Sequence, residues 1–309
     1  RSCLSSSTHV HLERRATKKV LAKLEGAYAP NTLKGYRCDF GVFDRFCLER
    51  GFTSCPSSVD TLIEYLESSI GTRKPQTLNR HLAAIDKVHV MLGHASPIKH
   101  PDVKLCMRRM SREHGVQSRQ AEGLTREIRD QLIAVTDQSL KGYRDRALLR
   151  LAYESMRRGS ELCAFGVDDV QRKANGSSLL YLKRSKTDQE GRGMWIALSA
   201  TCIEAIDDWL SVSQIRSGPI LRAVNLHGHV SDQPLNPKSL TEIYRQLAHQ
   251  AGLPRDFIRG LTSHSARVGA AQDLLKSGET LPQIMRRGGW KSPAIVMRYT
   301  EQTDLRPME

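Results

Sequence analysis

His264 and Arg267 are the residues whose types and spacing first indicate chemistry. They lie three apart in LTSHSARVGAAQDLLKSG, residues 261–278, at the expected start of a helix with Ser263 as its N-cap and Gly278 as its stop. Side chains three apart share one helix face, and the free N–H groups of a helix N-terminus favour an anion. A titratable imidazole beside a fixed guanidinium could hold an anion and act on it, although a structural use is the commoner role of such a pair taken alone.

Arg158 and Glu161 repeat this spacing, at the end of a segment that we expect to be one long helix, residues 143–162. Lys186 lies in KRSKTDQEGRG, a polar turn between two expected strands, from which a long amine can reach into a cleft. Taken alone, Arg158 and Glu161 are an ordinary surface ion pair, and Lys186 is an ordinary solvated residue. The joint pattern, and not any single position, favours a functional interpretation.

Trp290 and Tyr299 are nine residues apart, which on one continuous helix is a rotation of about 900° and puts them on opposite faces. The breaks at 288–289 and 292–293 remove this difficulty, because Trp290 then lies in a loop and Tyr299 on the next helix, capped by Ser292. Either aromatic residue could equally be part of a core.

Charge is the most informative feature of the composition. The 309 residues carry a net charge of +14, with about 20 basic against 11 acidic residues in positions 1–120. Such an excess either keeps a protein soluble or binds a polyanion, and composition leaves both open.

Other features exclude several classes of protein. No apolar run approaches the roughly 18 residues of a membrane span, and residues 1–15 lack the apolar centre of a secretory signal. The seven cysteines are scattered without a C-x-x-C pair, which indicates reduced thiols in an intracellular protein and argues against a zinc site. No cluster of carboxylates suggests a two-metal site either, so no metal is expected.

The elements that must position these residues form two domains of a mainly α fold with a small antiparallel β-sheet. We expect a helical domain at 1–114, a polar linker at 115–122 and a second domain at 123–309. The first domain should hold helices at 11–28, 31–51, 57–71, 74–93 and 101–115. The second should hold strands at 167–173, 177–184 and 193–199, the first two joined at Asn175-Gly176, and helices at 125–138, 143–162, 201–213, 237–252, 261–278 and within 281–301.

The joint pattern resembles the catalytic set of the tyrosine recombinase (phage integrase) family. The likeness covers about residues 122–300 and continues more loosely through the helical N-terminal part. Trp290 stands where most of the family has histidine. The positions that match are Arg158, Glu161, Lys186, His264, Arg267, Trp290 and Tyr299.

The resemblance implies that the anion is the scissile phosphate of DNA and that Tyr299 is the nucleophile. A phenol has a pKa of about 10 and is a weak nucleophile near neutral pH, so it needs help. His264 can take its proton or hydrogen-bond the phosphate, and Lys186 can protonate the departing 5′ oxygen. Lys183 lies in the same turn and stays an alternative acid.

The remaining members of the set hold charge. Arg158 and Arg267 can each offer paired donors to the non-bridging oxygens, and Trp290 one N–H. Glu161 would orient His264 or Arg158. The intermediate implied by the family is a 3′-phosphotyrosyl bond, which keeps the energy of the phosphodiester, so neither ATP, nor a metal, nor another cofactor is expected.

The family fold implies a C-shaped clamp around double-stranded DNA, with a helical core-binding domain on one face and the catalytic domain on the other. Helices 74–92 and 101–114 should meet the duplex. The contacts expected are Arg80, Lys87, Arg108, Arg109 and Arg112.

The function implied is site-specific recombination at inverted-repeat DNA sites, by a tetramer on two sites, in the cytoplasm at the nucleoid. Ten residues follow Tyr299, which is short for the C-terminal element with which family members commonly dock on a neighbour. Two alternatives stay open. One is a nicking-closing enzyme like the type IB topoisomerases, and the other is a sequence-specific DNA-binding protein with a decayed catalytic set.

Overall fold

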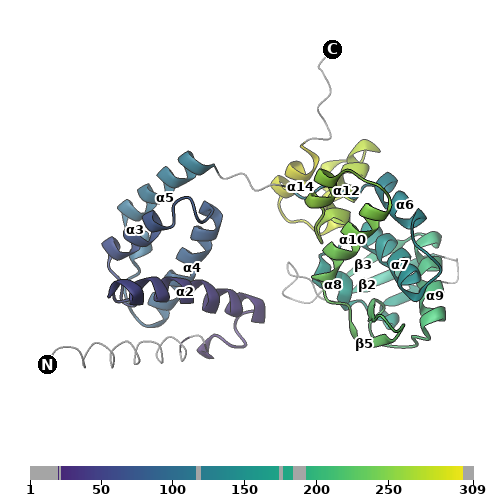
Figure 1. Cartoon of the computed structure of the whole chain (residues 1–309), viewed down its shortest axis with the longest axis horizontal. Coiled ribbons are helices and arrows are strands. Elements are labelled where there is room, and N and C mark those ends of the chain that lie inside the picture. The colour runs from purple at the N-terminus through teal and green to yellow at the C-terminus, as the bar shows by residue number, and fades with distance from the viewer. Residues whose placement is uncertain (1–19, 21, 116–119, 174–176, 184–192, 302–309) are drawn as a thin grey trace, which may run out of the picture. The chain divides into compact units, whose positions relative to one another are not determined.

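The computed structural model describes residues 20, 22–115, 120–173, 177–183 and 193–301. The chain divides into two compact units, Arg1–Ser118 and Arg119–Glu309 (Figure 1). The division falls within the expected linker, of which residues 116–119 lie outside the described residues, as does most of the expected helix 11–28.

The N-terminal unit is helical. Ser58 caps helix α3 (Val59–Ser68) by accepting from the N–H of Thr61. Helix α2 (Pro30–Arg50) is followed by Gly51 in the left-handed conformation, as the sequence predicts. Its core gathers around Phe43, Tyr65 and Ile85. The elements are α2 (Pro30–Arg50), α3 (Val59–Ser68), α4 (Pro75–Met91), the short 3-10 helix η1 (Pro97–Lys99) and α5 (Pro101–His114).

The second unit combines helices with two small antiparallel sheets. Its helices are α6 (Arg126–Ala134), α7 (Leu140–Ser155), α8 (Gly159–Ala164), η2 (Val167–Asp169), α9 (Ala200–Ser213), α10 (Ser239–Gln250), α11 (Arg255–Gly260), α12 (Ser265–Lys276), α13 (Leu281–Gly288) and α14 (Pro293–Thr300). Its strands are β1 (Val170–Arg172), β2 (Ser178–Leu182), β3 (Met194–Leu198), β4 (Arg222–Val224) and β5 (Val230–Pro234).

The three predicted strands form one antiparallel sheet in the order β1-β2-β3, with Leu180 opposite Ile196. Alternate side chains of β2 are buried, which is the period of two that the sequence shows. The turn expected at Asn175-Gly176 lies outside the described residues. The pair β4–β5 was not predicted, because its strands are short and irregular in register.

The sheet, α7 and α9 share the main core of this unit (Figure 1). Trp209 of α9 is fully buried and donates its indole N–H to the carbonyl of Ile220. Tyr244 of α10 is fully buried in the same core. The mainly α fold with small antiparallel sheets, predicted from the sequence, is confirmed.

The prediction of a single helix at 143–162 is wrong, because the structure has two helices, α7 and α8, in this segment. α7 ends at Ser155, Met156 takes the left-handed conformation with φ of 53°, and α8 begins at Gly159 with Arg158 as its N-cap. A methionine gives no sequence signal for positive φ, which is uncommon outside glycine, so the apolar pattern runs through the break unmarked. The break decides where Arg158 points.

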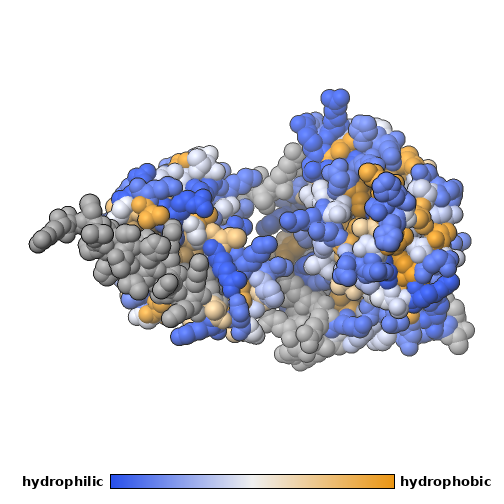
Figure 2. Space-filling view, turned by 60° about the horizontal axis from the view of Figure 1, so that its bottom comes forward, coloured by the Kyte–Doolittle hydropathy of each residue, from blue (hydrophilic) through white to orange (hydrophobic). Residues whose placement is uncertain are grey.

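None of the described helices is long and apolar enough to cross a membrane. The face of each unit seen in Figure 2 is mainly hydrophilic, with hydrophobic residues in small groups.

Candidate active site

The break between α7 and α8 positions Arg158 and Glu161. Glu161 is buried, and its carboxylate accepts from the backbone N–H of Arg158 at 3.1 Å and from Arg158 Nη1 at 2.9 Å. These two hydrogen bonds fix the guanidinium of Arg158 against the first turn of α8. Within the part of the chain that the structure describes, the bond from Nη1 to Glu161 aside, the guanidinium of Arg158 has nitrogens left for another acceptor.

The start of α12 positions His264 and Arg267. The predicted cap Ser263 is wrong, since the N-cap is His264, and Ser265 instead accepts from the N–H of Thr262 at 2.9 Å. Arg267 is 2% exposed. Its Nη1 donates to the carbonyl of Met156, in the α7–α8 break, and its Nη2 has no hydrogen-bond partner among the described residues. A buried donor without a partner is costly, so Arg267 Nη2 offers a place for an acceptor.

Trp290 connects Arg267 to Tyr299. The Arg267 guanidinium carbon lies 4.2 Å from the centre of the Trp290 ring, and the Trp290 and Tyr299 rings meet edge to face with centroids 5.8 Å apart. Gly288 leaves room for this ring, because a Cβ at that position would lie 1.9 Å from it. Ser292 and Pro293 begin α14 as predicted, and they bring Tyr299 onto the separate helix that the sequence indicated.

Two glutamines missed by the sequence analysis hold the backbone at Tyr299. The side-chain amides of Gln120 and Gln272 each donate to the Tyr299 carbonyl at 3.1 Å. Gln120 lies 179 positions from Tyr299 and belongs to no motif, so only its place in space gives it this role. Gln272 lies on α12, five positions after Arg267, where the predicted helix already placed it near the site.

The site is strongly electropositive. Burial is the largest cause that lowers the pKa of Arg267 to about 10; Arg158 and Arg157 add to this effect, and Tyr299 and Glu161 oppose it. Partial burial also lowers the pKa of His264, with Arg267 and Arg158 adding to the effect. Neutral imidazole is thus the favoured form of His264 near pH 7, and this form can accept a proton.

The two lysines of the strand turn differ. Lys186 lies outside the described residues. Lys183 Nζ lies 2.6 Å from Asp169 Oδ1, while Asp169 Oδ2 accepts from the N–H of Gly166 at 2.8 Å. This ion pair raises the pKa of Lys183. Because Asp169 is buried, Lys183 compensates a carboxylate that would otherwise lack a charged partner.

The five expected DNA contacts, all in the N-terminal unit, fall into two groups. Arg80 and Lys87 have intramolecular partners: Arg80 donates twice to Asp39, at 2.6 and 2.9 Å, and Lys87 donates to the hydroxyl of Tyr28 at 2.9 Å. The others are exposed on α5, and they are Arg108, Arg109 and Arg112.

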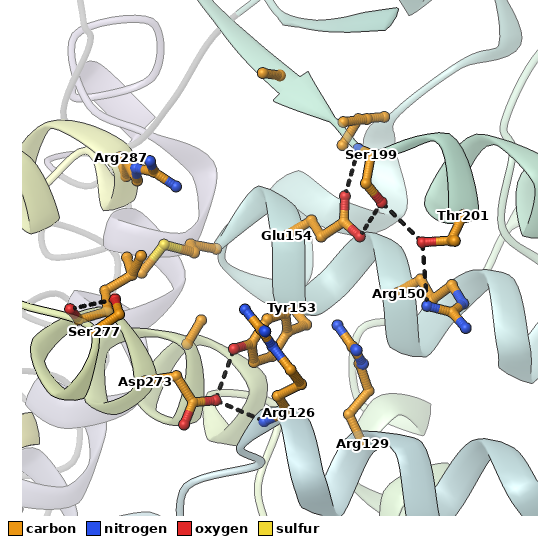
Figure 3. A pocket seen from close by; sticks show the side chains of 15 residues that line it. Arg126, Arg129, Arg150, Tyr153, Glu154, Ser199, Thr201, Asp273, Ser277 and Arg287 are labelled. Atoms are coloured by element: carbon orange, nitrogen blue, oxygen red, sulfur yellow. Dashed lines mark hydrogen bonds between the residues drawn. The ribbon is translucent and has the colours of Figure 1, made fainter. Parts of the chain in front are cut away.

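The second unit also has a cavity of about 570 Å³, whose lining includes Met156 and Arg287 (Figure 3). None of the described members of the predicted catalytic set lines it. Its two carboxylates already have partners, since Glu154 accepts from Ser199 and Asp273 from Tyr153. Within the described ranges, no group of three or more His, Cys, Asp and Glu side chains is placed to hold a metal ion.

Known proteins resemble this chain along most of its length. The phage integrase family matches residues 122–306. An integrase/recombinase XerD homologue of Selenomonas ruminantium is 30% identical over 98% of this chain and 90% of its own length. Recombinase Cre of Escherichia phage P1 is 29% identical over 82% of this chain and 78% of its own length.

Solved structures share the fold at lower identity. A XerH site-specific recombinase bound to a palindromic difH substrate has a TM-score of 0.68 at 16% identity, covering 93% of this chain and 80% of that one. A lambda integrase tetramer bound to a Holliday junction has a TM-score of 0.65 at 15% identity, covering 98% and 79%. With six of the seven predicted residues gathered around one electropositive site, and with a family match over more than half of its length, the chain belongs to the phage integrase family and is a tyrosine recombinase.

Proposed function

We propose that this recombinase cleaves and rejoins DNA strands through a covalent bond between Tyr299 and a 3′ phosphate. The observation that carries this proposal is the buried Arg267, whose Nη2 lacks a partner and whose guanidinium stacks on Trp290, the neighbour of Tyr299. A phosphate oxygen there would satisfy the donor and meet the positive charge of Arg158 and Arg267 together.

In the cleavage step the Tyr299 oxygen attacks the phosphorus, the Tyr299 O–P bond forms and the bond from phosphorus to the 5′ oxygen breaks. The phenol proton passes to His264, whose lowered pKa keeps the ring neutral and able to accept it. The departing 5′ oxygen takes a proton from a lysine and leaves as a hydroxyl. Rejoining is the reverse, with the 5′ hydroxyl of another strand.

Arg158 and Arg267 stabilise the charge that builds on the non-bridging oxygens. Glu161 holds Arg158 through two hydrogen bonds, so its carboxylate fixes the direction of that guanidinium. Trp290 packs against the face of Arg267 and keeps it in place, and its indole N–H is a further donor for the phosphate.

Lys186 is the better candidate for the acid. Lys183 is committed to Asp169, and the raised pKa of Lys183 makes it a weaker proton donor. The family resemblance fixes only that a lysine belongs in this turn, so the ion pair of Lys183 is what favours Lys186.

The phosphotyrosyl bond conserves the energy of the phosphodiester, and the chemistry therefore needs neither ATP nor a metal. The DNA partner is double-stranded and carries inverted repeats, as suggested by the palindromic substrate bound to the XerH structure. A tetramer on two sites brings together the four strands to be exchanged, and the lambda integrase tetramer bound to a Holliday junction supports this assembly. A protein with this substrate is expected at the nucleoid.

The experiment is covalent trapping on nicked inverted-repeat DNA from the gene's own locus. In a nicked substrate the short 5′ fragment diffuses away after cleavage, so the wild type should accumulate as a protein–DNA adduct. Tyr299→Phe keeps the ring and lacks the attacking oxygen, and it should bind DNA and give no adduct. An adduct that maps to another tyrosine, such as Tyr244, would refute the assignment.

The same reaction separates the alternatives. A decayed DNA-binding protein gives no adduct with the wild-type sequence. A nicking-closing enzyme gives the adduct but relaxes supercoiled DNA with one site and never joins strands from two sites. Recombinant strands from a two-site substrate support the recombinase.

A further inference from the structure

Arg157 is a buried charge beside the proposed phosphate site. It is 4% exposed and lies in the α7–α8 break, directly before Arg158. Its three hydrogen bonds within the described part of the chain all go to neutral acceptors. Nε donates to the carbonyl of Ser155 at 2.6 Å, Nη2 to the carbonyl of Arg287, and Nη1 to the sulfur of Met194 at 3.6 Å.

A buried guanidinium with only neutral partners is unusual, because burying a charge is expensive and proteins normally compensate it with an opposite one. Burial accordingly lowers the pKa of Arg157 to about 10, with Glu161 opposing and Arg158 adding to this effect. Near pH 7 the group is still charged. The protein therefore keeps a positive charge whose cost the folded structure alone does not offset.

The position of Arg157 links this charge to the site. The carbonyl of Arg287 that accepts from Arg157 lies in the last turn of α13, three residues before Trp290. A Cβ at Gly289, which has φ of +65°, would lie 2.8 Å from Arg157 Nη1, so the guanidinium occupies the space beside this turn. Arg157 thus holds the segment that presents Trp290 to Arg267.

Positive charge exceeds negative charge among the described residues of the site. The guanidinium groups of Arg157, Arg158 and Arg267 face the carboxylate of Glu161, and a phosphodiester attacked by a phenolate carries two negative charges that such an excess stabilises. We propose that Arg157 is a positioning residue of the phosphate site, which without touching the DNA adds positive charge beside Arg158 and Arg267 and holds the turn that carries Trp290. This inference rests on the proposed function.

The test measures single-turnover cleavage rates at low enzyme concentration on two substrates. The substrates differ only at the phosphate where the wild-type adduct maps. One is the ordinary phosphodiester, and in the other a methylphosphonate replaces one charged oxygen with a methyl group. Arg157→Met should slow cleavage of the phosphodiester by about 10- to 100-fold, less than the effect of losing a direct donor. On the methylphosphonate the attacked group carries one negative charge instead of two. Coulomb energy is proportional to charge, so the free-energy loss caused by Arg157→Met should halve, and a 30-fold loss of rate should shrink to about fivefold.

Arg157→Lys keeps the charge and should stay within about fivefold of the wild type on the phosphodiester. The matched control is Arg129→Met, which removes another buried arginine, one that contacts Asp130 and the ring of Tyr153. Any loss there should be equal on both substrates. Arg157→Gln, neutral but able to donate to a carbonyl, carries the same comparison if Arg157→Met does not fold.

Equal losses on both substrates, or a Lys variant no better than Met, would show that Arg157 only supports the fold and would overturn the inference. Wild-type rates in Arg157→Met would overturn it as well. Failure of the wild type to form any adduct is a different outcome, which removes the proposed function itself.

Discussion

Two buried polar clusters, one in each unit, are built on opposite principles. In the N-terminal unit, Asp39 accepts two hydrogen bonds from Arg80, and the hydroxyl of Tyr65 lies 2.6 Å from His81 Nδ1. Burial raises the pKa of Tyr65 to about 12 and lowers the pKa of His81, so both stay neutral. The arginine of this cluster has its carboxylate, and each of the other groups has a partner.

In the second unit, Arg157 and Arg267 are buried, whereas the side chain of Arg80 is 65% exposed at the edge of its cluster. Both donate to carbonyls, and Arg267 Nη2 has no partner among the described residues. A cluster with matched charges stabilises a fold, whereas one with excess charge costs stability until an ion of the opposite sign binds. The comparison separates residues kept for structure from residues that we propose are kept for a phosphate.

The largest expected effect on the cleavage rate is at Lys186, and the comparison is with Lys183, which is paired with the carboxylate of Asp169. Lys186→Ala should slow cleavage by about 10²- to 10⁴-fold, the usual range for a lost general acid. Sulfur in place of the bridging 5′ oxygen should restore the rate, because a thiolate, with a thiol pKa near 8.5, leaves without a proton. Lys183→Ala should lose about threefold or less, equally on both substrates, since its ion pair is exposed on the lysine side.

Single-turnover rates on the two substrates measure this difference, and Tyr299→Phe, whose defect is in attack, is the control that sulfur cannot rescue. Sulfur rescue of Lys183→Ala would make Lys183 the acid. Rescue of neither lysine variant would point to His264.

The next effect concerns Arg267. Arg267→Lys should cost about 2–4 kcal/mol in the chemical step, because a point charge cannot supply the planar fork. Its thermal midpoint should stay within about 3 °C of the wild type, since the residue is kept for the phosphate. Arg144→Lys is the control, because Arg144 is also buried but is paired with Asp145 at 2.7 Å. This variant should cleave at the wild-type rate. Wild-type cleavage by Arg267→Lys would end the bidentate assignment.

A substitution in the N-terminal cluster around Asp39 should have the opposite effect, on stability and not on cleavage. Asp39→Asn removes the charged partner of Arg80 and should lower the free energy of unfolding by about 1–3 kcal/mol, with the cleavage rate at saturating DNA unchanged. Urea unfolding of the full chain measures it. Glu25→Gln, in the exposed pair with Arg37, should change stability by less than about 0.5 kcal/mol. Unaltered stability of Asp39→Asn would remove the contrast between the two clusters.

The smallest effect is in two histidine titrations, both expected by NMR below the ordinary pKa of 6.5. For His264 part of the lowering comes from Arg267 and Arg158, so Arg158→Met and added salt should raise its midpoint. For His81 burial is the largest cause and Asp39 opposes it, so Asp39→Asn should lower its midpoint further.

Lowering the pH should affect different properties through the two histidines, namely stability through His81 and cleavage rate through His264. Since the folded pKa of His81 lies below its unfolded value, its neutral form gives stability that is lost as the pH falls through 6.5 toward that lowered pKa. For His264 the same fall should slow cleavage, because the protonated ring cannot accept the phenol proton. A His264 midpoint above 6.5 would contradict the electropositive site.

The sequence by itself determined the elements with strong local signals. Ser58 marks a helix end through its side chain, Gly51 through its access to positive φ, and Pro293 through its ring, and the structure has these ends where predicted. The residue types that can hold and attack a phosphate were likewise legible from their order and spacing, since chemistry restricts which side chains can do this work.

Only the tertiary structure decided how those residues are held. The left-handed Met156 breaks a helix that the apolar pattern runs through, and Gln120 reaches the backbone of Tyr299 from a segment without a motif. Arg80 and Arg157 are both arginines in basic stretches, yet one faces a carboxylate and the other only neutral acceptors. Local sequence cannot show this, because the partner of a buried charge is chosen by packing between segments far apart in the chain.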